Sequence, residues 1–139
     1  MTSLPSIDTI FDEYELLEGE DRYRLLIDLG RQLETMPDAL KTDATKVRGC
    51  SASVWVYPTA KDGGLHFLAD SNAAITKGIV ALILSAVEDK AAADIAVLDI
   101  NAALAPFELG KHLSANRTQG IPNMIALIKE TASRYTHLE

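Results

Sequence analysis

The residues best suited to chemistry lie around Cys50, the only cysteine of the 139-residue chain. Gly49 precedes it, and glycine adopts backbone conformations that other residues resist, so we expect a turn there. Lys46 and Arg48 flank this turn, and nearby cations favour the thiolate, the form that attacks sulfur and binds metals. These residue types predict a thiol nucleophile presented on a loop, just before an alternating, strand-like run.

Two other interpretations of Cys50 remain open on these observations. The thiol could belong to an enzyme or a peroxide-reactive protein in which His66 or His112 acts as the base. It could instead be an inert residue of a non-catalytic interaction domain, because free cysteine often behaves as a small buried hydrophobe. His66 lies in an expected strand and His112 near an expected helix end, where each also has a structural explanation.

No other motif indicates a metal or nucleotide site. A structural zinc site usually needs four cysteine or histidine ligands at defined spacings, whereas this chain has one cysteine and three scattered histidines. No Gly-x-x-x-x-Gly-Lys phosphate loop and no Gly-x-Ser-x-Gly serine motif occurs. We therefore expect no metal and no cofactor held by the chain itself.

Composition excludes further classes of protein. With 47% hydrophobic and 24% charged residues, the chain is typical of one globular domain spanning residues 1–139. A net charge of -7 argues against nucleic acid as a partner, since phosphate contacts come from lysine and arginine. The single cysteine fits a reducing cytosol. No signal peptide is evident, and the apolar run 79–87 is too short to span a membrane, so we expect a cytoplasmic protein.

Around the Cys50 loop, the hydrophobic pattern predicts an α+β fold. The expected strands are 53–59 and 65–69, joined by a turn at 61–64. Polar residues at 70–72 are expected to cap the helix that follows, and Gly30 suggests a close helix contact. The expected helices are 7–17, 20–36, 74–89, 91–97, 101–109 and a last helix that restarts near Pro122.

Three separated motifs occur in the order and spacing of the SufE/CsdE family, and the resemblance covers roughly Ile7 to Arg134. The motifs are Gly49-Cys50-x-x-x-Val54-Trp55, then Asp70-Ser71-x-x-Ala74-Ile75-x-Lys77-Gly78, then His112-Leu113-Ser114-x-x-Arg117-x-x-Gly120. The resemblance implies the fold of IscU-type scaffolds, an antiparallel sheet of about three strands packed with helices. It also implies a sulfur acceptor of iron–sulfur cluster assembly, an accessory protein that is not itself an enzyme.

The resemblance further implies partners and site residues. The sulfur donor would be a cysteine desulfurase of the SufS/CsdA type, whose pyridoxal phosphate belongs to that partner, and the recipient a SufBCD-type scaffold. Cys50 would be the acceptor nucleophile, and the hydrophobic run after it would form a pocket for the loop when no partner is bound. The candidates for shaping the loop and docking the partner are Arg48, Gly49, Ser51, Trp55, Asp70, Lys77, His112 and Arg117.

Overall fold

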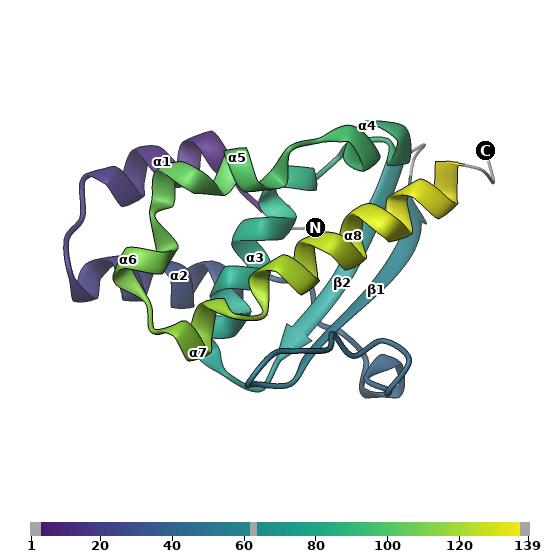
Figure 1. The fold of residues 1–139 in the computed structure, drawn as a ribbon, viewed down its shortest axis with the longest axis horizontal. Helices are drawn as coiled ribbons and strands as arrows, with labels where there is room; N and C mark the ends of the chain where they lie inside the picture. Colours follow the sequence, from purple (N-terminus) through teal and green to yellow (C-terminus); the bar gives the residue numbers. More distant parts are fainter. Residues whose placement is uncertain (1–3, 62–63, 137–139) are drawn as a thin grey trace.

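The computed structural model describes residues 4–61 and 64–136 and confirms the α+β class (Figure 1). The strands are β1 (Val54–Lys61) and β2 (Gly64–Ser71). The α-helices are α1 (Ile7–Glu15), α2 (Glu20–Arg31), α3 (Ala74–Val87), α4 (Ala92–Val97), α5 (Ile100–Leu104), α6 (Leu109–His112), α7 (Ala115–Thr118) and α8 (Ile121–Thr136). Two 3-10 turns are η1 (Asp38–Leu40) and η2 (Ala105–Phe107). The turn expected at 61–64 includes residues 62–63, which lie outside the described residues.

The sheet has two antiparallel strands in the described residues, and the expected third strand is reduced to one bridge between Lys46 and Trp55. Two backbone hydrogen bonds flank this bridge: Val47 N donates to Val54 O over 2.8 Å, and Val56 N to Thr45 O over 2.9 Å. The pairing extends no further because the Thr45 hydroxyl donates to Leu40 O over 2.6 Å and closes a turn there. The described sheet therefore has one strand fewer than the about three that the resemblance implied, while the fold class is as expected.

The short pairing defines the Cys50 loop as residues 48–53, since Val47 and Val54 are joined directly before and after it. The other edge of the loop's base is held by Asn72, whose side-chain Oδ1 accepts from Ser53 N over 3.1 Å. The backbone of the same two residues pairs as well, from Asn72 N to Ser53 O over 3.3 Å. The loop thus leaves the sheet between two fixed points.

Helix α3 is the centre of the core, as the hydrophobic pattern predicted. Its residues from Ile79 to Leu84 are all 3% exposed or less. Helix α2 crosses it closely at two glycines: a Cβ at Gly30 would lie 2.9 Å from Gly78 N, and a Cβ at Gly78 would overlap Leu26 O. The close contact expected at Gly30 is confirmed, and it lets two helix backbones touch.

Replacing Gly78 by alanine should therefore destabilise the fold. The added Cβ meets a backbone carbonyl that cannot rotate away, so α2 and α3 must separate, at a cost of about 1–3 kcal/mol. The free energy of unfolding in urea measures this effect. Gly110→Ala is the matched control, because a Cβ there meets nothing within 4 Å. Equal stability of the two variants would contradict the close crossing.

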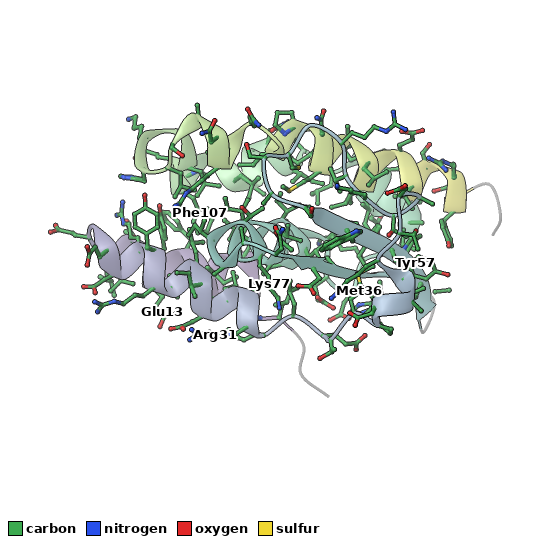
Figure 2. All side chains as sticks on the ribbon, turned by 90° about the horizontal axis from the view of Figure 1, so that it is seen from below. Glu13, Arg31, Met36, Tyr57, Lys77 and Phe107 are labelled. Carbon is green, nitrogen blue, oxygen red and sulfur yellow. The ribbon has the colours of Figure 1, made fainter. Side chains whose placement is uncertain are left out.

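Two predicted helices differ in extent from those observed. The helix expected to reach residue 36 ends at Arg31, and the chain then carries Met36, 3% exposed, to the side of the sheet away from α8 (Figure 2). The helix expected over 101–109 is divided into α5, η2 and α6. Pro106 and the left-handed backbone of Glu108 (φ 49°) interrupt it.

Helices α6 and α7 lead to the Cys50 loop, and α8 begins beside it and runs away toward the C-terminus. In Figure 1, α6 and α7 descend at the left and α8 crosses diagonally in front, with the Cys50 loop beneath the start of α8. The buried face of α8 is formed by Met124, Ile125, Ile128 and Ala132. The junction between α7 and α8 lies directly against the loop.

Candidate functional site

Cys50 is half-buried on its loop and packs against the hydrophobic core. Gly49 has a φ of 82°, a left-handed conformation that favours glycine, so the predicted turn is confirmed. Gly120, at the start of α8, provides the space for the thiol. A Cβ there would overlap the Sγ of Cys50 and lie 3.1 Å from its Cβ. Cys50 thus occupies a seat that exists because residue 120 has no side chain.

Three side-chain hydrogen bonds hold the Cys50 loop to the α7–α8 junction. Ser51 Oγ donates to Asn116 O over 3.1 Å and accepts from Gln119 Nε2 over 2.7 Å. Asn123 Nδ2 donates to Arg48 O over 2.9 Å. Each of these bonds is on the surface and worth about 0.5–1.5 kcal/mol. These three bonds therefore fix the position of the loop, but they are weak enough for the loop to move away from the α7–α8 junction.

Sequence reasoning missed Asn72, Gln119, Gly120 and Asn123 as site residues. Gly120 closes the third motif and Asn72 lies within the second, so motif membership was the signal that could have found these two. Gln119 and Asn123 carry no such signal. Their part in holding the loop depends on where the α7–α8 junction lies in three dimensions.

Burial raises the pKa of the Cys50 thiol. Lys46 and Arg48 were expected to lower this pKa, so the direction is opposite to the prediction. Their side chains are exposed, and the cause of the shift is the desolvation of the thiol. Neither cation offsets the effect of burial on the pKa of the thiol in this conformation. The seated thiol is held in its protonated, weakly nucleophilic form at neutral pH.

Alkylation by iodoacetamide should show this shift directly. Only the thiolate reacts, so the rate for the native protein should rise with pH around a midpoint above that of the same thiol in the urea-unfolded chain. At neutral pH the native protein should react more slowly than the unfolded chain. A native midpoint below the unfolded one would mean that Lys46 and Arg48 outweigh burial.

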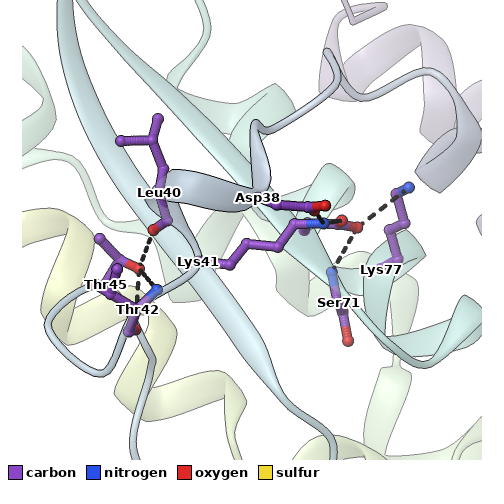
Figure 3. Close-up of polar contacts among 8 residues, drawn as sticks. Asp38, Leu40, Lys41, Thr42, Thr45, Ser71 and Lys77 are labelled. Atoms are coloured by element: carbon purple, nitrogen blue, oxygen red, sulfur yellow. Dashed lines mark hydrogen bonds and ion pairs between the residues drawn. The ribbon is translucent and has the colours of Figure 1, made fainter.

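Asp70 is the centre of an ion-pair cluster at the base of the loop, and Figure 3 shows its partners Lys41, Lys77 and Ser71. Its carboxylate meets Lys41 Nζ at 2.7 Å and Lys77 Nζ at 3.2 Å, and accepts from Ser71 N over 2.8 Å. Burial alone would raise the pKa of Asp70, but the hydrogen bonds from Lys41, Ser71 and Lys77 outweigh it and lower the pKa. The cluster ties the segment after η1 to the end of β2 and the start of α3.

Trp55 also lies at the base of the Cys50 loop. It pairs with Asp70 across the two strands, and Lys41 Nζ lies 5.8 Å from the centre of its ring. Residues 70–72 were expected to cap α3, but the N-cap of α3 is Ala73. Asp70 instead forms ion pairs with lysines, and Asn72 accepts a hydrogen bond from Ser53. Ser71 Oγ does accept from Ala73 N over 3.3 Å. Tertiary contacts displaced the expected caps.

His112 and Arg117 lie around Tyr23, beside the α6–α7 segment. The Tyr23 hydroxyl donates to His112 O over 3.0 Å, and the Arg117 guanidinium carbon lies 5.9 Å from the centre of the Tyr23 ring. The His112 ring Nε2 is 3.0 Å from Arg22. The contacts of His112 hold α6, and the contact of Arg117 holds α7, which follows α6 and presents Asn116 to the loop, so both residues support the loop's seat from behind.

No hydrogen bond or ion pair among the described residues joins a histidine to Cys50. His66, in β2, lies between Glu34 and Glu88 at 3.7 and 3.5 Å, and His112 is bonded to Arg22. In the same part of the chain, no group of His, Cys, Asp or Glu is placed to hold a metal ion. None of the described helices is long and apolar enough to cross a membrane.

Comparison with known proteins identifies relatives of the chain. Residues 8–132 match the family described as "SufE: Fe-S metabolism associated domain". The chain is 37% identical over 134 residues to an "uncharacterized SufE-like protein" of Rhizobium meliloti (strain 1021), covering 93% of this chain and 96% of that protein. It is 42% identical over 107 residues to "sulfur acceptor protein CsdE" of Escherichia coli (strain K12), covering 76% and 73%.

A solved structure supports the fold independently. The solution structure of a hypothetical protein from Thermus thermophilus matches with a TM-score of 0.75, covering 96% of this chain and 97% of that one. Its sequence identity is 12%, so this likeness concerns the fold alone.

The fold and the site together define an α+β protein that shelters one thiol on a loop between a small sheet and its last helix. Since the family match covers most of the chain, the protein belongs to the SufE family, associated with Fe–S metabolism. The resemblance read from the three sequence motifs is confirmed.

Proposed function

We propose that the protein is a sulfur acceptor in Fe–S metabolism, in which Cys50 takes sulfur from the persulfide of a cysteine desulfurase. The observation that carries this proposal is the seated loop: the only thiol of the chain is half-buried against Gly120 and held by three surface hydrogen bonds. A relative 42% identical bears the name of a sulfur acceptor protein. A sheltered but releasable thiol suits a group that carries sulfur between two proteins.

The transfer is a thiol–disulfide exchange with a persulfide as substrate. Cys50 loses its proton to solvent, and its thiolate attacks the outer sulfur of the donor persulfide. A bond forms between this sulfur and Cys50 Sγ, while the sulfur–sulfur bond of the donor breaks. The donor cysteine leaves as a thiolate that takes up a proton, so electrons and protons balance without a further oxidant or reductant.

The loop has to leave its seat for this attack. Sγ faces Gly120 and the core, and burial raises its pKa, so the seated thiol is both hard to reach and mostly protonated. Moving residues 48–53 outward exposes the sulfur and removes the desolvation that disfavours the thiolate. After transfer, the return of the loop shields the persulfide from water and from other thiols.

The remaining site residues divide between holding the loop and meeting the partner. Gly49 and Ser51 shape the closed loop, whereas Trp55, Asp70 and Lys77 fix its base, and His112 supports α7 from behind. Arg48 and Arg117 are exposed and contribute to docking, and Arg117 also supports α7 through its contact with Tyr23. In this proposal the protein holds no cofactor, stimulates the desulfurase without being an enzyme, and passes its sulfur to a SufBCD-type scaffold.

The test measures alanine formed from L-cysteine by a SufS-type desulfurase without added reductant. Without an acceptor, the desulfurase stops once its own cysteine carries the persulfide. Adding the protein should increase the yield by at least one equivalent of alanine per chain, since the chain has one thiol. Dithiothreitol, itself a sulfur acceptor, shows that the desulfurase is active. A yield unchanged by the protein, with full activity in dithiothreitol, would refute the proposal.

A further inference from the structure

A groove of about 400 Å³ begins beside the Cys50 loop and runs between residues 43–48 and α8. Lys46 and Arg48 line it on one side. The hydrogen bond from Asn123 to Arg48 O closes its end nearest to Cys50. The other wall is formed by Asn123, Ala126, Leu127 and Glu130. A molecule lying in this groove would therefore reach the loop at its N-terminal anchor.

Lys46 and Arg48 are exposed and, in the part of the chain that the structure describes, neither forms an ion pair. Most other cations of the molecule are neutralised locally. Ion pairs with carboxylates are formed by Arg24, Arg31, Lys41, Lys77, Lys111 and Arg134. Two uncompensated cations beside the Cys50 loop, in a chain of net charge -7, are available to carboxylates of another molecule.

The groove also has a direction. Asp43 lines it before Lys46 along one wall, and Glu130 lies seven residues beyond Asn123 on α8, about 10 Å along the helix. Glu130 is paired with Arg134 on its own helix. The end beside the Cys50 loop is therefore cationic, whereas the far end carries Asp43, which forms no ion pair in the described part of the chain.

We propose that this groove docks the donor desulfurase through a segment that carries carboxylates beside its persulfide cysteine. This inference rests on the sulfur-acceptor function proposed above. Carboxylates next to the donor cysteine would meet Lys46 and Arg48, while Asp43 would repel the carboxylates of a segment entering in the opposite direction. This charge complementarity brings the donor persulfide to Cys50 and favours one orientation of the donor segment. Charge complementarity usually sets orientation and specificity at protein interfaces.

The experiment uses a cysteine desulfurase that transfers sulfur to the wild-type protein, and measures the protein concentration giving half-maximal transfer at low and high salt. For the wild type this concentration should rise with salt, which screens attraction. The double variant Lys46→Glu with Arg48→Glu should need about tenfold more protein at low salt. Its requirement should then fall as salt increases, because salt screens repulsion.

A merely structural defect would not invert the salt dependence. Lys90→Glu is the control: it reverses one charge, half the change in the double variant, on an exposed lysine whose backbone pairs with Leu65, at the end of β2 away from the loop. Arg48→Gln, which removes a charge without reversing it, should fall between wild type and the double variant. The conservative Arg48→Lys should behave as wild type.

Two results would overturn the docking proposal while leaving the sulfur-acceptor function intact. In one, the double variant matches Lys90→Glu in half-maximal concentration and salt dependence. In the other, charge reversal leaves uptake from the desulfurase unchanged and slows only delivery to a scaffold, which would assign the groove to the recipient. Failure of the wild type to accept any sulfur is a separate result and refutes the function itself.

Discussion

Cys50→Ser should abolish sulfur uptake from a cysteine desulfurase. Serine keeps the size and polarity of the side chain but lacks the sulfur that forms the new bond, and the chain has no second cysteine to replace it. Alanine formation with this variant should stay at the single-turnover level of the desulfurase alone. The expected loss is complete, since no other described group can form a persulfide.

The variant should remain folded, which makes the loss interpretable. Cys50 lies on a half-buried loop outside the helices and strands, and the volume of its side chain is nearly conserved. The urea midpoint should therefore stay close to that of wild type. Ser51→Ala is a useful companion, because it weakens the loop's bonds to Asn116 and Gln119 but keeps the thiol. Residual uptake by folded Cys50→Ser would contradict the assigned role.

Gly120→Ala should expel Cys50 from its seat. The new Cβ would occupy the position of the thiol, and overpacking of this kind costs about 1–3 kcal/mol in the closed state. The open loop does not bear this cost, so the equilibrium should shift towards it. The alkylation rate of Cys50 at neutral pH should rise about ten- to a hundredfold.

Gly110→Ala controls for the general effect of alanine in this region, because a Cβ there meets no atom within 4 Å. Its alkylation rate should match that of wild type. The expelled thiol should also titrate nearer to the ordinary pKa of cysteine, since the burial that raises the pKa is lost. An unchanged rate and pH midpoint in Gly120→Ala would mean that the closed seat does not control the thiol.

The parts of the molecule fixed by local chemistry were predictable from the sequence. The turn at Gly49, the alternation of the two strands and the buried run of α3 each follow from residue type and spacing. The glycine in α2 correctly indicated a close helix crossing. The three motifs identified the family because their order reflects the whole chain.

The parts set by tertiary contacts were not predictable. Helix α2 ends at Arg31, although the apolar pattern continues to Met36, which is buried outside the helix on the side of the sheet away from α8 (Figure 2). From the sequence, Asp70 is equally well explained as a helix cap. Its ion pair with Lys41, which is distant in sequence, is evident only from the folded structure. The direction of the Cys50 pKa was wrong for the same reason: sequence neighbours such as Arg48 do not reveal where their side chains point.

The most direct test of the central claim is the intact mass of the protein after incubation with a cysteine desulfurase and L-cysteine, without reductant. We expect the wild type to gain the mass of at least one sulfur atom, the gain to disappear on adding a reductant, and Cys50→Ser to show none. A desulfurase that turns over in dithiothreitol yet leaves the wild-type mass unchanged would contradict the account. So would a sulfur gain that persists in Cys50→Ser.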